Sequence, residues 1–259
     1  MSIIRPVTLN INKPIGWTSR DVLNKLQNIY NFKHFGHAGT LDPLATGVLI
    51  VLVAKATKNQ NYYLEKNKEY KTRIFFGVTS ETYDLEGPYK ISKPLNLSVE
   101  DLENKIKEYL TSILGKFNQT VPYYSSTKVE GKELYAYARA GEEIPVLPSK
   151  DVVLLEYIID KIQLNTTKIQ QMPNKLEIKN RDIANEYTKT LEFFTRNFSY
   201  VDLTLKTGKG FYVRSLASDL GEYTGLGALM GSLVRSKVGD LKVEDAKDID
   251  YFNNKPDLI

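Results

Sequence analysis

Apolar and polar residues follow two different spacings along this chain. Apolar residues three or four positions apart predict helices over 18–30, 98–114 and 212–220. Alternation with a period of two predicts strands over 70–78 and 199–207, and the apolar run over 152–159 is typical of a buried strand. Thr18 and Ser19 are candidate N-caps of the first helix, and Gly221 is expected to end the last one. Because helices and strands do not alternate strictly, this order indicates an α+β fold.

Two long stretches differ from the rest of the chain. Residues 121–148 are rich in Tyr, Lys, Gly and Pro, which predicts a long excursion with a short helix near 134–140. Residues 161–197 carry dense charges of both signs, which is typical of a solvated insertion with weak helical content. The first stretch offers few core anchors, so we expect it to be mobile.

The composition limits the classes of protein that fit. The chain has 259 residues, of which 42% are hydrophobic, enough for a sizeable core. Its longest apolar run, over 48–54, is far shorter than the roughly 20 residues of a membrane helix, and residues 1–14 lack a signal-peptide core, so we expect an intracellular, cytoplasmic protein. The absence of cysteine and the presence of only two histidines argue against a disulfide, a thiol nucleophile or a zinc site. A net charge of +4 suits an anionic partner without deciding for one.

The stretch over 36–49, GHAGTLDPLATGVL, contains the best candidate for chemistry. Asp42 precedes Pro43, which fixes its own φ and biases Asp42 away from a helix. Gly39 and Gly47 permit sharp bends or close approaches on either side. Such a loop presents its carboxylate, and an ionised carboxylate can form a covalent intermediate without a metal. We therefore expect the chemistry at Asp42.

Seven motifs, in order along the chain, resemble the bacterial TruB-type tRNA pseudouridine synthases, which isomerise a uridine in the T loop of tRNA. They lie at 12–19, 36–49, 68–70, 77–87, 122–139, 208–216 and 233–239. The motif around Asp42 is specific by itself, whereas the pieces rich in lysine and glycine are weak alone. The resemblance implies a pseudouridine-synthase-like catalytic domain, built on a mixed, largely antiparallel sheet with flanking helices.

The resemblance also implies a reaction on tRNA without a cofactor or a metal. Asp42 corresponds to the catalytic aspartate, which attacks the uracil ring or its sugar, and Arg214 to the cation that keeps this carboxylate charged beside an uncharged base. The implied partner is the T arm of tRNA, and no obligate protein partner or membrane is implied. The alternative is a non-catalytic tRNA-binding or tRNA-folding protein on the same scaffold. A pure binder, however, has no need for a carboxylate that repels phosphate.

The remaining implied site residues would receive the target base. Tyr70, which belongs to the implied catalytic set, is expected to stack on the base, and Tyr212 and Leu233 complete the wall of the pocket. His37 and Lys13 are expected to bind the substrate. A base must leave its stack before it can be reached, and stacking on an aromatic side chain offsets part of this cost, roughly 1–3 kcal/mol per base.

Each of these residues also has a purely structural interpretation. Asp42 could cap a turn, and Arg214 could form an ordinary surface salt bridge. Tyr70 could be a core residue of a strand, His37 an ordinary turn histidine, and Leu233 part of the hydrophobic core. For Leu233 the packing role and the functional role are compatible.

A second carboxylate, Asp84, invites a glycosidase interpretation when it is combined with Asp42. Trp17 is the only tryptophan, so no tryptophan cluster for sugar binding accompanies the pair. Asp84 also stands in a context rich in Gly and Pro, where capping of a turn is the better explanation. We therefore discount the glycosidase.

We expect residues 1–259 to form a single catalytic domain. A mobile RNA-binding excursion is expected at 121–148, and a charged insertion at 161–197. The chain ends about two dozen residues after Arg235, so we expect the small C-terminal RNA-binding domain that many relatives carry to be largely missing.

Overall fold

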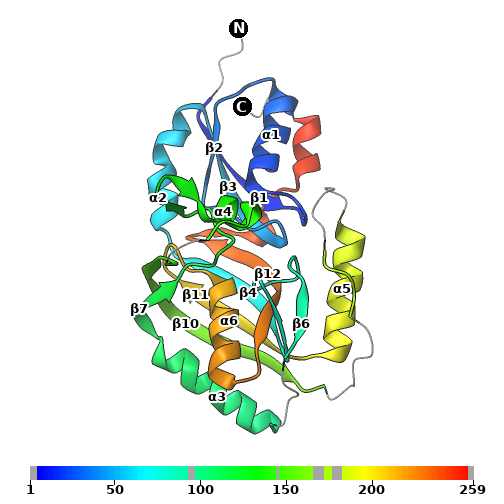
Figure 1. Cartoon of the computed structure of the whole chain (residues 1–259). Coiled ribbons are helices and arrows are strands. Elements are labelled where there is room, and N and C mark those ends of the chain that lie inside the picture. Colours follow the sequence, from blue (N-terminus) through cyan, green and yellow to red (C-terminus); the bar gives the residue numbers. More distant parts are fainter. Residues whose placement is uncertain (1–4, 93–96, 144–145, 166–171, 177–182, 256–259) are drawn as a thin grey trace. The chain divides into compact units, whose positions relative to one another are not determined.

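The computed structural model describes residues 5–92, 97–143, 146–165, 172–176 and 183–255. The chain divides into two units (Figure 1). Unit 1 comprises Met1–Lys71, Ile178–Glu186 and Leu233–Ile259, and unit 2 comprises Thr72–Glu177 and Tyr187–Ser232. Three of the boundaries between the units fall within strands β4 (Lys68–Phe76) and β12 (Ala228–Val238) and within helix α5 (Ala184–Asn197). The expectation of a single catalytic domain stays a prediction.

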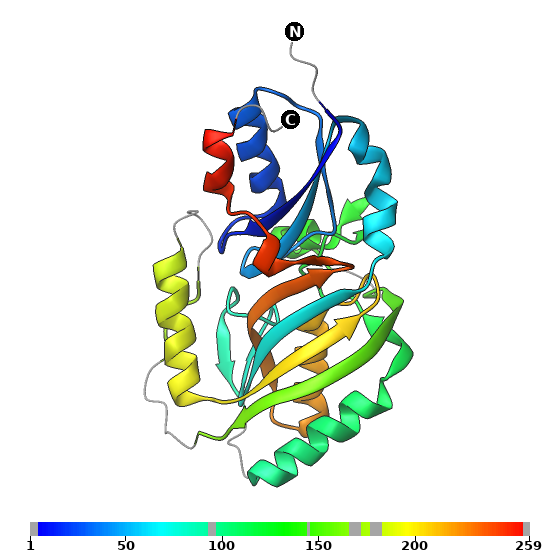
Figure 2. The ribbon, with the colours of Figure 1, turned by 180° about the vertical axis from the view of Figure 1, so that it is seen from behind.

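Unit 1 is organised around strand β3 (Ala45–Val53), whose residues 48–53 are fully buried. β1 (Val7–Lys13) and β2 (Phe35–Ala38) pair with it antiparallel, and the end of β12 pairs with its first residues in parallel. The short strand β13 (Leu241–Lys242) follows β12 in a hairpin. The helices of this unit are α1 (Ser19–Tyr30), η1 (Ala54–Asn59), α2 (Gln60–Glu65), η2 (Val243–Asp245) and η3 (Ile249–Asn254). Figure 2 shows α1 beside η3.

Helix α1 begins where its sequence predicts. The Thr18 hydroxyl accepts a hydrogen bond from the Asp21 N–H at 3.1 Å, and the Asp21 carboxylate accepts one from the Thr18 N–H at 3.0 Å. This reciprocal pair is a capping box, which satisfies two main-chain donors at the start of the helix. Val22 and Leu26, one turn apart, are fully buried and turn the apolar face of α1 inward.

Unit 2 contains a sheet in the order β12, β4, β11, β10 and β7. β10 (Ser149–Gln163) pairs antiparallel with both β11 (Ser199–Thr207) and β7 (Gly115–Thr120). Helix α6 (Val213–Thr224) lies in front of the strands in Figure 1 and behind them in Figure 2, and it packs on α3 (Val99–Ser112). The other elements are the hairpins β5–β6 (Val78–Ser80, Tyr89–Ile91) and β8–β9 (Lys128–Val129, Lys132–Glu133) and the helices α4 (Leu134–Ala140) and α5 (Ala184–Asn197).

The expected α+β fold with a mixed, largely antiparallel sheet is confirmed, since β3 and β12 pair in parallel whereas β1, β2, β7, β10, β11 and β13 take part in antiparallel pairs. The predicted helices over 18–30, 98–114 and 134–140 and the strands over 70–78 and 199–207 all form, with small shifts of their ends. Among the helices of the described ranges, none is long and apolar enough to cross a membrane.

Helix α6 does not end at Gly221, so that prediction is wrong. It continues to Thr224, and Gly225, with φ of 74°, adopts the left-handed conformation that ends it. Gly221 is needed for close packing inside the helix, because a Cβ there would lie 2.2 Å from the main-chain nitrogen of Ala228. A glycine that permits a close approach looks, in sequence, like a glycine that ends a helix.

Two further expectations need correction. The predicted buried strand over 152–159 forms as part of β10, but only Val152 and Leu154 are buried in it, and Leu155 and Ile158 are exposed because the neighbouring elements do not cover their faces of the strand. In the charged stretch, α5 is a helix of 14 residues with Thr190 and Phe194 buried, which is more structure than the expected weak helical content. Its aromatic residues supply this apolar face, and Phe194 packs on Phe75 at a ring distance of 5.4 Å. Residues 166–171 and 177–182 of that stretch lie outside the described residues.

Candidate active site

Asp42 lies in the loop between β2 and β3, outside any helix, as expected. The Ala45 N–H donates to the Asp42 carbonyl at 3.0 Å, so residues 42–45 form a turn with Pro43 at its second position. Gly39 and Gly47, with φ of 90° and 97°, adopt the left-handed conformation at the two ends of the segment. The Asp42 side chain is half-buried.

Lys13, at the end of β1, holds this loop by hydrogen bonds to main-chain carbonyls. The lysine is fully buried, and its Nζ donates to the carbonyls of Pro14, Trp17 and Pro43 at 2.8, 2.5 and 3.2 Å. Burial lowers the pKa of Lys13 to about 7, and the nearby Asp42 opposes this shift. In this structure the ammonium group faces main-chain carbonyls, and the direct substrate contact expected of Lys13 stays a prediction.

The first residue of α1 holds the same loop. The buried Ser19 hydroxyl accepts a hydrogen bond from the Leu41 N–H at 2.9 Å. The Gly16 N–H donates to the Pro43 carbonyl at 2.9 Å. The residues on both sides of Asp42 are thus fixed by the motif at 12–19.

Three other expected site residues belong to unit 1. Leu233 on β12 pairs with Ala45, three positions after Asp42, and is buried. Tyr70 is buried on β4, so a packing role and a role toward a base are both compatible with its position. His37 on β2 is half-buried, and its pKa is lowered by burial and then by the charges of Arg20 and Arg235. Its buried Nδ1 has no hydrogen-bond partner among the described residues.

Arg214 lies near the start of α6 in unit 2 and is 5% exposed. Its Nη1 donates to the Thr82 carbonyl at 3.1 Å and its Nη2 to the Tyr124 carbonyl at 2.9 Å. Its Nε is 3.8 Å from the Asp84 carboxylate. A surface salt bridge therefore does not describe this residue, because the guanidinium is buried and oriented by three groups.

Asp84 has two roles in unit 2. It accepts hydrogen bonds from the Thr82 hydroxyl at 2.6 Å and from the Glu86 N–H at 2.9 Å, so it caps its turn as the sequence predicts. The ion pair with Arg214 is the second role, and nothing in the local sequence around Asp84 indicates it. Both groups are nearly inaccessible to solvent, so breaking the pair would leave a buried charge unmatched.

Tyr212 is fixed in place by a glutamine of β7. The buried Gln119 side chain accepts from the Tyr212 N–H at 2.9 Å and donates to the Tyr212 carbonyl at 3.0 Å. The Tyr212 hydroxyl is 3.0 Å from the Thr127 hydroxyl. This clamp fixes the entry of α6, which has no side-chain N-cap of its own.

The expected site residues divide between the units. Lys13, His37, Asp42, Tyr70 and Leu233 belong to unit 1, and Tyr212 and Arg214 to unit 2. Within unit 1, the structure brings Lys13 and Leu233 to the Asp42 loop.

The sequence matches one protein family over more than half its length. Residues 27–171, which are 145 of the 259, match the family described as TruB family pseudouridylate synthase (N terminal domain). A protein of Ligilactobacillus salivarius named tRNA pseudouridine synthase B is 36% identical over 93% of this chain and 70% of its own length. The protein of the same name from Bacteroides thetaiotaomicron is 33% identical over 97% of this chain and 93% of its own length. The chain belongs to the TruB family.

Solved structures support the fold of this TruB-family chain. A chain in a Cbf5-Nop10-Gar1 complex has a TM-score of 0.60 at 22% identity, and one in an H/ACA RNP bound to a substrate RNA containing 2′-deoxyuridine has a TM-score of 0.58 at 20% identity. Each match covers 96% of this chain. The chain spans little more than half of those two chains, 55% and 54%. The likeness is one of fold.

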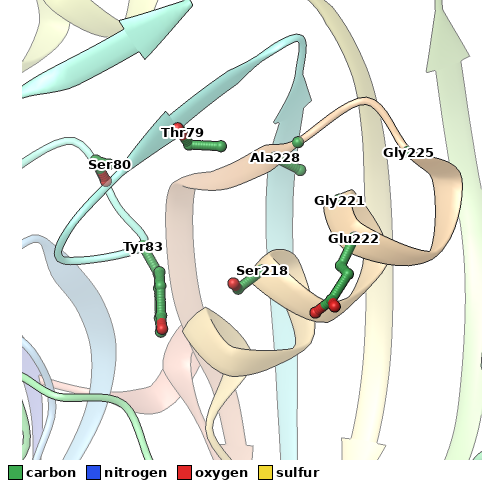
Figure 3. A pocket seen from close by; sticks show the side chains of 9 residues that line it. Thr79, Ser80, Tyr83, Ser218, Gly221, Glu222, Gly225 and Ala228 are labelled. Carbon is green, nitrogen blue, oxygen red and sulfur yellow. The ribbon is translucent and has the colours of Figure 1, made fainter. Parts of the chain in front are cut away.

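A hollow of about 300 Å³ in unit 2 of this TruB-family chain is separate from the expected site residues. Figure 3 shows the side chains of Tyr83, Ser218 and Glu222 at this hollow, between the β5–β6 hairpin and the end of α6. None of the expected site residues is among its lining residues. The chemistry of the TruB family is therefore not assigned to this hollow.

Sequence reasoning missed three residues that hold the site of this TruB-family chain: Gln119, the Arg214 partner Asp84, and Arg235 of β12. Two of these contacts join residues 93 and 196 positions apart, so no local pattern could reveal them. The only available signal was the position of Asp84 and Arg235 inside recognised motifs.

Proposed function

We propose that this chain converts a uridine in the T loop of tRNA into pseudouridine, with Asp42 as the catalytic carboxylate. The family is that of pseudouridylate synthases, and its curated relatives are named tRNA pseudouridine synthase B. The observation that carries the proposal is the Asp42 loop, which Lys13, Ser19 and Arg235 fix on several sides. Such fixation is what a reacting group requires, since its geometry must be held before the substrate arrives.

The proposed reaction is an isomerisation whose atoms balance. The bond between uracil N1 and ribose C1′ breaks, a bond between uracil C5 and C1′ forms, and the hydrogen on C5 leaves as a proton while N1 gains one. Asp42 forms a covalent bond to the sugar, from which it is displaced when the new carbon–carbon bond forms, or to the ring, from which it is eliminated after that bond has formed. No net oxidation or reduction occurs.

Arg214 is proposed, on its match to the family's arginine, as the cation that keeps Asp42 ionised. A carboxylate beside an uncharged base tends to take up a proton, and a nearby positive charge opposes this. In unit 2 the orientation of the Arg214 guanidinium is fixed by two main-chain carbonyls and one carboxylate. Tyr70, Tyr212, Leu233 and His37 are proposed to receive the flipped base and the T arm, and stacking on Tyr70 offsets part of the cost of unstacking.

The decisive experiment is Asp42→Asn, assayed by tritium release from tRNA labelled at uracil C5. The substitution keeps the shape and removes the nucleophile, so the single-turnover rate should fall by about a thousandfold or more, which corresponds to about 4 kcal/mol. Affinity for tRNA should stay similar or rise, because the change removes a negative charge. Asp245→Asn, which neutralises an exposed aspartate of η2, is the matched control.

Two outcomes would contradict the proposal. Tritium release by Asp42→Asn at the wild-type rate would show that another group is the nucleophile. Wild-type protein that binds tRNA without releasing tritium would favour the non-catalytic tRNA-binding or tRNA-folding protein. A tRNA whose T-loop uridine is replaced by cytidine tests the T-arm assignment, and release from other labelled uridines of that tRNA would refute it.

A further inference from the structure

Arg235 is one of the largest side chains that are almost fully buried, at 2% exposure. It lies on β12, where residues 233–235 pair in parallel with residues 45–47 of β3. The two strands approach so closely here that a Cβ on Gly47 would lie 2.3 Å from the Arg235 carbonyl oxygen. The main chain of Arg235 is therefore fixed directly against the end of the Asp42 loop.

The side chain of Arg235 holds the other end of the same loop. Its Nη2 donates to the Gly39 carbonyl at 3.0 Å and its Nη1 to the Thr40 carbonyl at 3.4 Å. Its Nε donates to the Val48 carbonyl at 2.7 Å. One planar guanidinium thus ties the residues before Asp42 to a residue after it. The absence of a side chain at Gly39 permits this, since a Cβ there would already lie 3.4 Å from Nη1.

This guanidinium has an unusual set of partners for a buried cation. Its hydrogen-bond acceptors are three neutral main-chain carbonyls, and within the described ranges no carboxylate lies at ion-pair distance from it. Taking a charge out of water costs several kcal/mol, and neutral acceptors repay this less completely than a carboxylate does. Stability alone is therefore a poor explanation for an arginine at this position.

The geometry points to Arg235 as a positioning residue for Asp42. Its rigid fork joins Gly39, Thr40 and Val48, so the loop between them has its two ends at a fixed separation, and the carboxylate is held at one place relative to the strand. Catalysis needs a reacting group placed to within a fraction of an ångström, and a misplacement of about 1 Å can cost about a hundredfold in rate. This inference rests on the proposed role of Asp42 as the nucleophile.

The first test compares Arg235→Lys with Arg73→Lys. Arg73 is a matched control because it also makes three side-chain hydrogen bonds, to Asp202 and Thr195 on β11 and α5. Lysine cannot reproduce a fork that reaches three acceptors. Arg235→Lys should lower the single-turnover rate of tritium release by about a hundredfold and leave the tRNA dissociation constant close to that of the wild type. Arg73→Lys should retain the rate.

The second test separates positioning from loss of fold. Arg235→Ala leaves a space of the right shape for a guanidinium ion, so millimolar guanidinium should restore part of the rate, whereas an alkylammonium ion of similar size should not. Urea unfolding of each variant reports stability independently. A rate for Arg235→Lys equal to that of the wild type would overturn the inference. So would a loss of rate that follows stability alone and is not rescued by guanidinium.

A third measurement does not depend on activity and so separates this inference from the proposed function. Amide hydrogen exchange over residues 39–47 should be faster in Arg235→Lys than in the wild type, because the Leu41 and Ala45 amides are protected only while the loop is closed. Unchanged exchange over these residues would refute the role of Arg235 in holding the loop. A wild type without tritium release would instead refute the proposed function.

Discussion

Asp219, on α6, offers a stability prediction that can be worked from its surroundings. Burial where α6 packs on α3 is the main cause that raises the pKa of Asp219 to about 6, and the nearby Glu222 adds to it, whereas the hydrogen bond from the Tyr109 hydroxyl opposes the shift. The Asp219 carboxyl therefore binds its proton more tightly in the folded chain than in the unfolded chain, where its pKa is 3.8. The charge of Asp219 is a cost to the folded state at neutral pH.

The sign and size of the effect follow from linkage. Between about pH 4 and pH 6 the Asp219 carboxyl is more protonated in the folded chain than in the unfolded chain, so its contribution to the free energy of unfolding falls as the pH rises through this window. A shift of about 2 units corresponds to about 3 kcal/mol, and partial exposure of the side chain reduces this to about 1–2 kcal/mol. Asp219→Asn keeps an acceptor for Tyr109 and removes the charge. The variant should therefore be more stable than the wild type by that amount above about pH 7.

Urea unfolding at about pH 4 and above about pH 7 tests the prediction, with ΔG of unfolding taken from the linear extrapolation. The gain from Asp219→Asn should be present at the higher pH and vanish at the lower one, where the wild-type carboxyl is itself protonated. Asp240→Asn, at an exposed aspartate in the turn between β12 and β13, controls for the general loss of one negative charge. A gain that is equal at both pH values, or a variant no more stable than the wild type above about pH 7, would refute the reasoning.

Two further predictions concern the proposed reaction. Arg214→Lys should lower the single-turnover rate more than it weakens tRNA binding, because an ammonium group cannot replace a guanidinium group that is held by Thr82, Tyr124 and Asp84. A single-turnover rate equal to that of the wild type would show that Arg214 takes no part in the reaction. The excursion over 121–148 should be cleaved by a protease more slowly when tRNA is bound, because its Lys and Tyr side chains offer phosphate and stacking contacts. Equal cleavage with and without saturating tRNA would contradict its ordering by RNA.

Local signals in the sequence were enough for most of the secondary structure. The helix over 18–30 and the one over 98–114 each begin at a capping box, Thr18 with Asp21 and Ser98 with Asp101, and these signals lie within four residues. The loop around Asp42 was equally readable, because Pro43 and the flanking glycines restrict the main chain locally. These features depend only on near neighbours, so sequence alone can predict them.

The supports of the site could not be predicted in the same way. Arg235 contacts Val48 across 187 positions, and its role depends on the parallel pairing of two distant strands. The pairing of Asp84 with Arg214 likewise joins a turn to a helix far along the chain, while the local context of Asp84 indicated only a cap. Gly221 shows the opposite failure, since a local signal suggested a helix end where Ala228, beyond the end of the helix, required a close approach.

The contact between β12 and the Asp42 loop also sets the order in which the site can form during synthesis. A nascent chain that has emerged as far as Ser232 contains Asp42, its turn and the supporting Lys13 and Ser19, but it lacks the arginine that closes the loop. Contacts between residues far apart in sequence form late, because the chain between them must first be brought together. With the proposed role of Arg235, the Asp42 carboxylate acquires its final position only after Arg235 has left the ribosome, and a truncated chain carries Asp42 without the closed loop.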